Sequence, residues 1–233
     1  MKTVTKRPVL PLQGMKTEQQ HRDEIVHFGR LLHRNGLVAA TDGNLSLRLS
    51  NGNVLCTPTL MSKGLMAPED LVVVDRHGKK VKGLREPSSE LAMHLFIYRG
   101  RPDVGAVVHA HPPTATGYAV AGIPLDRALC SEIVMTLGSV PLANYGTPGT
   151  PELTERLAPL VADHDAILMA NHGVVTCGAN LLSAYMNMET VEHFAKISLV
   201  THLLGKQRPL SKQHILKLRE IRLQHLSYDR AAR

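Results

Sequence analysis

Three histidines in this chain have the residue type and spacing of metal ligands. His109 and His111 stand two apart at the end of an apolar segment, GAVVHAH, and His172 follows a second apolar segment, AILMAN. Residues two apart on a strand point to the same face, so both imidazoles of the pair can reach one ion. Three imidazoles leave one position of a tetrahedral site open, which is typical of catalytic zinc. We therefore expect Zn²⁺ here, with Mn²⁺ or Co²⁺ as alternatives.

The His109–His111 pair is weak when it is counted alone. With 13 histidines in 233 residues, chance yields roughly 0.7 pairs of this spacing. Its position adds weight, because polar rings at the end of an apolar strand are costly to bury unless they are satisfied. Pro112-Pro113 then ends the strand, and sheet ends are common places for sites in α/β proteins. Half-exposed histidines without a ligand remain the alternative at this point.

Glu90, in the segment PSSE, is the candidate acid/base. We expect it in the first turn of a helix over 88–98, where the helix dipole favours a carboxylate whatever its function. The functional interpretation is a general acid/base beside the metal. His94 follows one helical turn later on the same face, and we expect it to pack or cap rather than to bind the metal.

Several turns rich in small donors could bind an anion. Free N–H groups at the start of a helix at Ser88 and Ser89 suit a phosphate. Gly43-Asn44 and Thr57-Pro58-Thr59 are two further turns of this kind, and Lys63 could add charge. Each of these residues is also ordinary in caps and turns, so none is specific by itself.

The periodicity of apolar residues predicts the elements that must position these side chains. Helices are expected over 18–34, 88–98, 114–121, 181–204 and 211–225. The first of them has Thr17 as its N-cap and stops at Gly36. Strands are expected over 44–49, 53–57, 71–75, 106–110, 140–144, 166–170 and 174–176, with a hairpin turn at Asn51-Gly52. This order predicts one α/β domain, 1–233, with a mixed sheet covered by helices on both sides.

The charge of +7 is confined to the two ends of the chain. Residues 1–18 carry +3 and residues 211–233 carry +4, whereas positions 19–210 hold seventeen charges of each sign. We interpret 1–17 and 211–233 as a basic tail and a basic terminal helix. Aromatic residues make up 3% and Trp is absent, which argues against a nucleic-acid partner.

The chain also lacks the signals of a membrane or secreted protein. It has no apolar run near eighteen residues and no apolar core in its N-terminal segment, so we expect neither a membrane span nor secretion. Its three cysteines, Cys56, Cys130 and Cys177, are widely spaced and typical of reduced thiols. The expected location is the cytoplasm.

Taken in order, the motifs GNLSLRL, TPT, PSSE, VVHAH, PLANYGTPGT and NHGVVTCG resemble the class II aldolase/adducin family. The resemblance covers roughly residues 20–205 and is closest to its fuculose-phosphate aldolases. It implies a three-layer α/β/α fold with a mainly antiparallel sheet, and a homotetramer with active sites between subunits. It also implies zinc ligands at His109, His111 and His172, with Glu90 as acid/base. The phosphate pocket it implies consists of Gly43, Asn44, Thr59, Ser88 and Ser89.

The sequence departs from that family pattern in two places. Leu60 stands where the fuculose-phosphate enzyme has Gly after TPT, so we expect a rebuilt phosphate loop to which Ser62 or Lys63 contributes. The aldolase tyrosine expected some twenty residues after the HxH pair is absent. Glu132 lies there instead, near the acidic residue of related epimerases, and Tyr228 is a loose counterpart of a tail tyrosine that reaches the neighbouring site.

The leading hypothesis from the sequence is a zinc-dependent aldolase. It would cleave a ketose 1-phosphate, deoxy- or thio-substituted at C5, to dihydroxyacetone phosphate and an aldehyde, with catalytic residues Glu90, Glu132 and Tyr228. The alternatives are a sugar-phosphate 4-epimerase, a sugar-acid-phosphate decarboxylase and a methylthioribulose-phosphate dehydratase. An adducin-like module without catalysis is disfavoured because all three histidines and Glu90 are present.

Overall fold

The computed structural model describes residues 16–231, with side chains as far as residue 224. Within this part of the chain, one eight-stranded sheet has the order β4-β3-β2-β1-β5-β8-β7-β6. Its strands are β1 (Asn44–Arg48), β2 (Val54–Cys56), β3 (Val72–Val74), β4 (Lys80–Lys82), β5 (Ala106–Ala110), β6 (Leu142–Ala143), β7 (Ala166–Met169) and β8 (Gly173–Gly178). Neighbouring strands are antiparallel except for the parallel pair β6 and β7. The mixed, mainly antiparallel sheet is confirmed.

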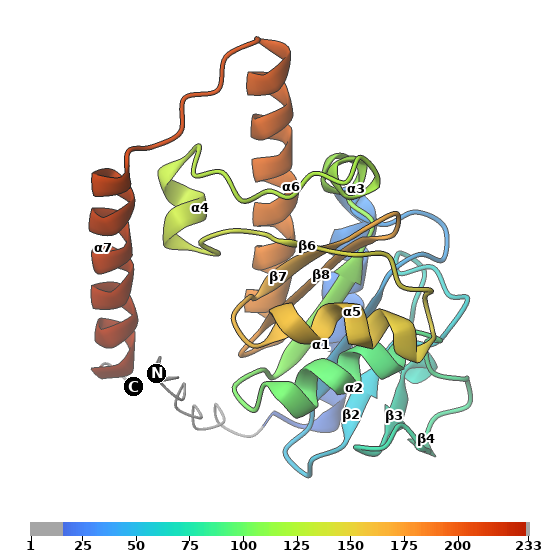
Figure 1. The fold of residues 1–233 in the computed structure, drawn as a ribbon. Helices are drawn as coiled ribbons and strands as arrows, with labels where there is room; N and C mark the ends of the chain where they lie inside the picture. The colour runs from blue at the N-terminus through green and yellow to red at the C-terminus, as the bar shows by residue number, and fades with distance from the viewer. Residues whose placement is uncertain (1–15, 232–233) are drawn as a thin grey trace.

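Helices cover both faces of this sheet (Figure 1). One face carries α1 (Glu18–Arg34), α3 (Pro113–Val120) and α6 (Leu181–Leu203), and the other carries α2 (Leu91–Gly100) and α5 (Pro151–Val161). The helices α4 (Ser131–Met135) and α7 (Lys212–Ala231) pack against each other beside α6, and a 3-10 turn, Pro68–Asp70, precedes β3. The predicted three-layer α/β/α architecture is therefore confirmed.

Local signals in the sequence explain where the helices on the α1/α6 face begin and end. Thr17 Oγ1 accepts a hydrogen bond from Gln20 N at 3.2 Å, and the Gln20 side chain accepts one from Thr17 N at 2.8 Å. This reciprocal capping box starts α1 at the predicted place, and Gly36 in the left-handed region follows its end. Asn180 and Ser183 form the same kind of box at the start of α6.

The start of α2 differs from the prediction. Ser88 N donates to Thr57 O at 3.2 Å, and Pro58 and Pro87 form an isolated antiparallel bridge. This long-range pairing holds Pro87 and Ser88 outside the helix, so α2 begins at Leu91. The prediction that Ser88 and Ser89 open the helix is wrong, and Glu90 occupies the N-cap position rather than the first turn.

Three elements were not predicted from the sequence: α4, α5 and β4. Leu153, Leu157 and Val161 form the buried face of α5, at the spacing of a helix. Pro159 lies inside α5, and an internal proline normally argues against a helix. Here it stands in the last turn, so only the end of the helix must accommodate it.

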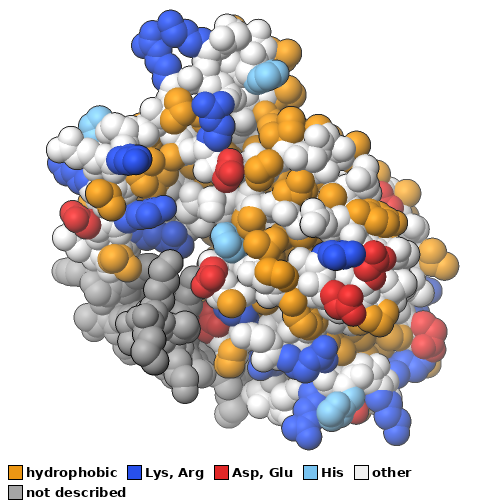
Figure 2. Space-filling model, viewed as in Figure 1, with side chains coloured by type: hydrophobic (Ala, Val, Ile, Leu, Met, Phe, Trp, Pro, Cys, Tyr) orange, Lys and Arg blue, Asp and Glu red, His pale blue; other side chains and the backbone are white. Residues whose placement is uncertain are grey.

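The surface seen in Figure 2 mixes apolar side chains with charges of both signs. Apolar side chains gather across the middle of this face, over α3 and β6, and basic side chains lie along its lower edge. Among the described residues, no helix is both long enough and apolar enough to cross a membrane.

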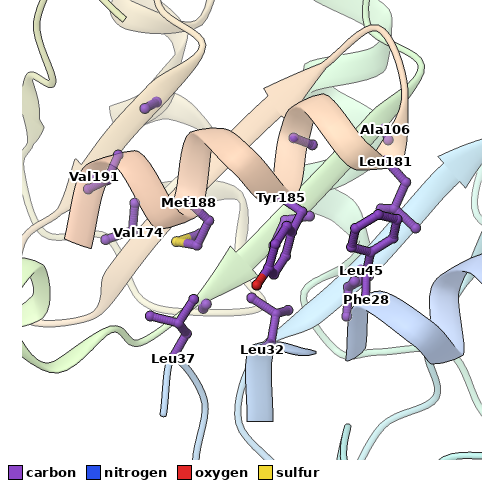
Figure 3. Packing of buried hydrophobic residues seen from close by; sticks show 14 of the residues in the cluster. Phe28, Leu32, Leu37, Leu45, Ala106, Val174, Leu181, Tyr185, Met188 and Val191 are labelled. Carbon is purple, nitrogen blue, oxygen red and sulfur yellow. The ribbon is translucent and has the colours of Figure 1, made fainter. Parts of the chain in front are cut away.

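The core on the α1/α6 face is packed around α6 (Figure 3). Phe28 of α1 meets Tyr185 of α6 with ring centroids 5.0 Å apart, and Leu32 and Met188 are fully buried beside them. Burying side chains of this size stabilises the fold by about 1.5–3 kcal/mol each. Tightly packed helices therefore support the sheet whose end carries the histidines.

Candidate metal centre

The three histidines predicted as ligands form one cluster. His109, His111 and His172 each present a ring nitrogen, and these atoms lie within 4.8 Å of one another. Nε2 of His109 and Nε2 of His111 are 3.1 Å apart. Two imidazole ligands of a tetrahedral zinc ion would be about 3.4 Å apart, given Zn–N distances of about 2.05 Å. The cluster therefore has the dimensions of a metal site.

His109 is placed by its strand and by its second ring nitrogen. It is fully buried at the end of β5, and its Nδ1 donates to the carbonyl of Val174 on β8 at 2.9 Å. That bond puts the proton on Nδ1 and leaves the Nε2 lone pair free for a metal. A Cβ at Gly43 would lie 2.7 Å from the carbonyl oxygen of His109, so only glycine allows this approach of the chain before β1.

His172 is placed by the tight turn between β7 and β8. Asn171 adopts a positive φ of 54°, which asparagine tolerates better than most residues. A Cβ at Gly173 would lie 2.5 Å from Cδ2 of His111, so glycine is required where the turn passes the second ligand. The tight turn formed by Asn171 and Gly173 thus brings His172 to the end of β5.

His111 lies just beyond β5, and acidic side chains contact it and the chain that follows it. Its Nδ1 is 3.4 Å from Asp42 Oδ2, a carboxylate–histidine arrangement that orients ligands in metal sites. The buried carboxylate of Glu192, on α6, accepts hydrogen bonds from the backbone N–H groups of Thr114 and Ala115. These bonds anchor the first turn of α3, which begins two residues after His111.

The Glu90 carboxylate faces the same cluster. Oε2 is 3.2 Å from Nε2 of His109, and Oε1 is 3.1 Å from Nε2 of His172. Oε2 also accepts a hydrogen bond from Asn44 Nδ2 at 2.9 Å. Oε1 is buried and has no hydrogen-bond partner of good geometry among the described residues. An orphaned carboxylate oxygen beside three imidazoles is suited to a cation or to a substrate proton.

The electrostatics of the cluster favour an ionised Glu90 and a neutral His111. Burial would raise the pKa of Glu90, but the neighbouring His109 and His172 outweigh burial and hold this pKa well below its usual range. Burial opposes a charge on His109, yet the Glu90 carboxylate raises the His109 pKa above its ordinary value. Burial and the charge of His109 lower the pKa of His111 to about 4. Glu90 is thus ionised and His111 neutral at pH 7, and a metal would have to displace the proton that Glu90 favours on His109.

The segments predicted to bind phosphate converge beside Glu90. Thr59 N donates to Glu86 O at 3.0 Å, which pairs the TPT turn with the chain leading to Ser88 and Ser89. Ser88 Oγ accepts from Glu90 N at 3.3 Å, and the Ser89 side chain is exposed. Asn44 differs from the expectation, because both ends of its amide are engaged inside the protein.

Lys63 holds the loop that contains Ser62. Its side chain is buried, and Nζ donates to Thr41 O at 2.7 Å and to Met61 O at 2.6 Å. Burial lowers the pKa of Lys63 to about 8, although Asp42 and Glu90 act to raise it. The ammonium group therefore ties this loop to the turn before Gly43.

Glu132 and Tyr228 are not brought to the cluster within one chain. Glu132 is exposed on α4, where its Oε2 accepts from Ser131 Oγ at 3.0 Å, and α4 packs beside α7. No contact between Glu132 and the three histidines is found in the described part of the chain. The Tyr228 side chain lies outside the described residues.

His94 and Asp42 are site residues whose roles the sequence reasoning missed. His94 is buried, as expected, but it also bonds to Asn44, which in turn bonds to Glu90. Its position four residues after Glu90 on one helix face was the available signal. The contact of Asp42 with His111 had no signal beyond its place next to Gly43-Asn44.

The sequence matches the family described as Class II Aldolase and Adducin N-terminal domain over residues 23–199. The chain belongs to this family. Class II aldolases depend on a metal, and the three histidines of this member could hold one.

Two curated relatives and one solved structure illustrate the range of the family. The chain is 38% identical over 186 residues to 3-oxo-tetronate 4-phosphate decarboxylase of Escherichia coli K12, covering 78% of this chain and 87% of that protein. It is 34% identical over 201 residues to 5-deoxy-D-ribulose 1-phosphate aldolase of Bacillus thuringiensis serovar kurstaki, covering 86% and 94%. A solved L-fuculose 1-phosphate aldolase has 33% identity and a TM-score of 0.82, covering 88% and 97%. The expected likeness to fuculose-phosphate aldolases is confirmed.

Proposed function

We propose that this class II aldolase family member is a metal-dependent carbon–carbon lyase acting on a phosphorylated sugar or sugar acid. The ligands would be His109, His111 and His172, and Glu90 would transfer the proton. The observation that carries the proposal is the placement of the Glu90 carboxylate, 3.2 Å and 3.1 Å from Nε2 of two of these histidines. A general acid/base must lie within such reach of the reacting atoms.

The donor set fits a borderline divalent cation, and we propose Zn²⁺. Neutral imidazoles suit such ions, and the orphaned Glu90 Oε1 faces the same space. A cation held there supplies a Lewis acid for negative charge that develops on substrate oxygens. The residues of the chain do the rest: the Val174 carbonyl fixes the tautomer of His109, and Glu90 moves a proton at the neighbouring carbon.

Two cleavage reactions produce the same enediolate of dihydroxyacetone phosphate. One is loss of CO₂ from a 3-oxo-tetronate 4-phosphate, and the other is retro-aldol cleavage of a ketose 1-phosphate. Retro-aldol cleavage requires a base to remove the C4 hydroxyl proton, whereas a carboxylate leaves as CO₂ without any proton to remove. Within one chain, Glu90 is the one described carboxylate in contact with Nε2 atoms of the cluster. The similarity to the Escherichia coli decarboxylase favours decarboxylation.

Retro-aldol cleavage of a ketose 1-phosphate is the second candidate. The specific observation in its favour is the similarity to the Bacillus thuringiensis aldolase, which extends over 86% of this chain. The apolar segment HPPTATGYAVAG offers few groups for a polyol, which suits a deoxy-sugar end. No comparable observation favours the epimerase or the dehydratase.

We assign the substrate phosphate to the turns that contain Thr59, Ser62, Ser88 and Ser89. Gly43 would contribute its backbone N–H or carbonyl, because the chain packs so closely against His109 here that only glycine fits. Asn44 is reassigned from the phosphate to Glu90, since its amide donates to Oε2 at 2.9 Å. Bound phosphate would fix the substrate geometry relative to Glu90.

We further propose a homotetramer with active sites between subunits. Large apolar side chains are exposed where α6 ends, and Leu203 and Leu204 are 75% and 76% exposed. Exposed apolar clusters of this kind mark surfaces that another chain covers. In such a tetramer, Glu132 or Tyr228 of one subunit could reach the metal centre of its neighbour.

Product analysis of the metal-loaded protein tests the proposal. With 3-oxo-tetronate 4-phosphate we expect CO₂ and dihydroxyacetone phosphate, and with 5-deoxyribulose 1-phosphate an aldehyde would appear if the second candidate is correct. Release of neither product would contradict both. Both candidate reactions end with protonation of the same enediolate, and this step can be tested without the full substrate. Dihydroxyacetone phosphate incubated with the protein in D₂O should take up deuterium at its hydroxymethyl carbon.

A further inference from the structure

A chain of buried polar side chains leads from the interior to Glu90. Asn44 and Ser46 lie two apart on β1 and face α2, where His94 and Tyr98 stand four residues apart. His94 Nε2 is 2.5 Å from Asn44 Oδ1, and its Nδ1 is 2.7 Å from Ser46 Oγ. Ser46 Oγ is in turn 2.8 Å from the Tyr98 hydroxyl. His94 is thus bonded at both ring nitrogens.

The chemistry of these groups allows one assignment of their protons. An ionised Glu90 only accepts, so the Asn44 contact must be its Nδ2–H, and Asn44 Oδ1 must then accept from His94 Nε2–H. Burial, with the charge of His109, lowers the pKa of His94 to about 3, so the ring is neutral and Nδ1 is bare. Nδ1 therefore accepts from the Ser46 hydroxyl, and Ser46 Oγ accepts from Tyr98.

We propose that His94 is a positioning residue for the catalytic carboxylate, acting through Asn44. By donating Nε2–H to Asn44 Oδ1 it holds the amide in the one orientation that donates to Glu90 Oε2. This inference rests on the proposed role of Glu90 in proton transfer.

The alternative orientation of Asn44 is unfavourable on both sides. A flipped amide would place its oxygen against the Glu90 carboxylate and its N–H₂ against the N–H of His94. A hydrogen bond to a charged group contributes about 1.5–3 kcal/mol, and burial makes a mismatch more costly. With Oε2 held by Asn44, Oε1 is the oxygen that faces His172, and it accepts no hydrogen bond of good geometry from the described residues. The geometry assigns proton transfer to Oε1.

Two substitutions at His94 separate positioning from packing. In His94→Gln the amide nitrogen takes the place of Nε2 and can still donate to Asn44. In His94→Asn the shorter side chain reaches Ser46 but not Asn44. Deuterium uptake by dihydroxyacetone phosphate, KM, bound metal and thermal unfolding would be measured for both variants and the wild type.

We expect His94→Asn to slow deuterium uptake by about tenfold or more, which corresponds to loss of about 1.4 kcal/mol of transition-state stabilisation. KM and metal content should change by less than about twofold, since neither the ligands nor the phosphate turns are touched. His94→Gln should restore most of the rate. Equal rates in the two variants, or a loss of rate that follows loss of metal, would overturn the proposal.

Nitrogen NMR of the His94 ring gives a readout that does not depend on catalysis. We expect a neutral ring protonated on Nε2 from pH 5 to pH 9, and slow exchange of the Asn44 side-chain N–H₂ in the wild type and His94→Gln but not in His94→Asn. A ring protonated on Nδ1, or fast Asn44 exchange in the wild type, would contradict the positioning role. If the wild type takes up no deuterium while these NMR signals are as expected, the proposed function fails and the hydrogen-bond chain stands.

Discussion

Asn44 on β1 is paired directly across the sheet with His109 on β5. The register between β1 and β5 therefore fixes the positions of both the metal ligand His109 and the amide that bonds to Glu90. A shift of β1 by one residue would turn Asn44 to the opposite face of the sheet. The histidine ligand and the orientation of the acid/base are consequently coupled through the backbone, and changes in either strand should affect both.

Removal of a ligand should abolish metal binding. We expect His109→Ala and His172→Ala to lower bound metal from about one ion per chain to near zero, and to reduce turnover to background, because two imidazoles hold the ion poorly. Metal analysis after gel filtration and circular dichroism would check this. His77→Ala, at an exposed histidine outside the site, is the matched control and should retain metal. Full metal content in either ligand variant would remove that histidine from the site.

Glu90→Gln should keep the metal but lose proton transfer. The amide retains the shape of the carboxylate and lacks its basicity, so deuterium uptake by dihydroxyacetone phosphate should fall about 10²- to 10⁴-fold. The measurement is NMR of the hydroxymethyl signal in D₂O. Unchanged uptake would exclude Glu90 as the acid/base, and Glu86→Gln, at an exposed neighbour, is the control.

If active sites are shared, Glu132 should act on the neighbouring subunit. Glu90→Gln and Glu132→Gln would each be nearly inactive alone. Unfolding and refolding them together should restore about a quarter of wild-type activity if the two roles combine at one site, because random pairing leaves that fraction of interfaces intact. Active Glu132→Gln protein would show that Glu132 has no catalytic role.

The loop after TPT should be stabilised by glycine at position 60. Leu60 has a φ of 52° and is 83% exposed, so its side chain gains little from packing and strains the backbone. We expect Leu60→Gly to raise the free energy of unfolding by about 0.5–1 kcal/mol. Leu60→Ala keeps the Cβ and should give no comparable gain in urea denaturation. Equal effects of the two substitutions would show that the backbone is not strained there.

The stability of the protein should depend on pH through His94. Its pKa is about 3 in the folded protein, below the ordinary value near 6.5. Between these values the unfolded chain binds the proton and the folded protein does not, so stability is lost as the pH falls from 6.5 towards 3. Between pH 7 and pH 5 the wild type should lose about 2 kcal/mol more than His94→Gln. Denaturation of both proteins with a chelator present would measure this, and parallel pH profiles would contradict it.

Many elements of the fold were predictable because their signals are local. The Thr17 capping box and Gly36 bound α1, and the Asn51-Gly52 turn joins β1 to β2 as expected. The start of α2 was not predictable, because the pairing of Ser88 with Thr57 joins residues far apart in the sequence. The helix α5 was not predicted, and it contains Pro159, a residue that normally argues against a helix.

The sequence by itself determined which groups this protein can use: His109 and His111 two apart at the end of one strand, His172 just before Gly173, and Glu90. Residue type and short-range spacing are local properties, so they can be read along the chain. Only the tertiary structure decided that His172 meets the pair, that the Asn44 amide bonds to Glu90, and that Glu132 lies apart from the cluster within one chain. These relationships depend on strand register and on helix packing, which join residues distant in sequence.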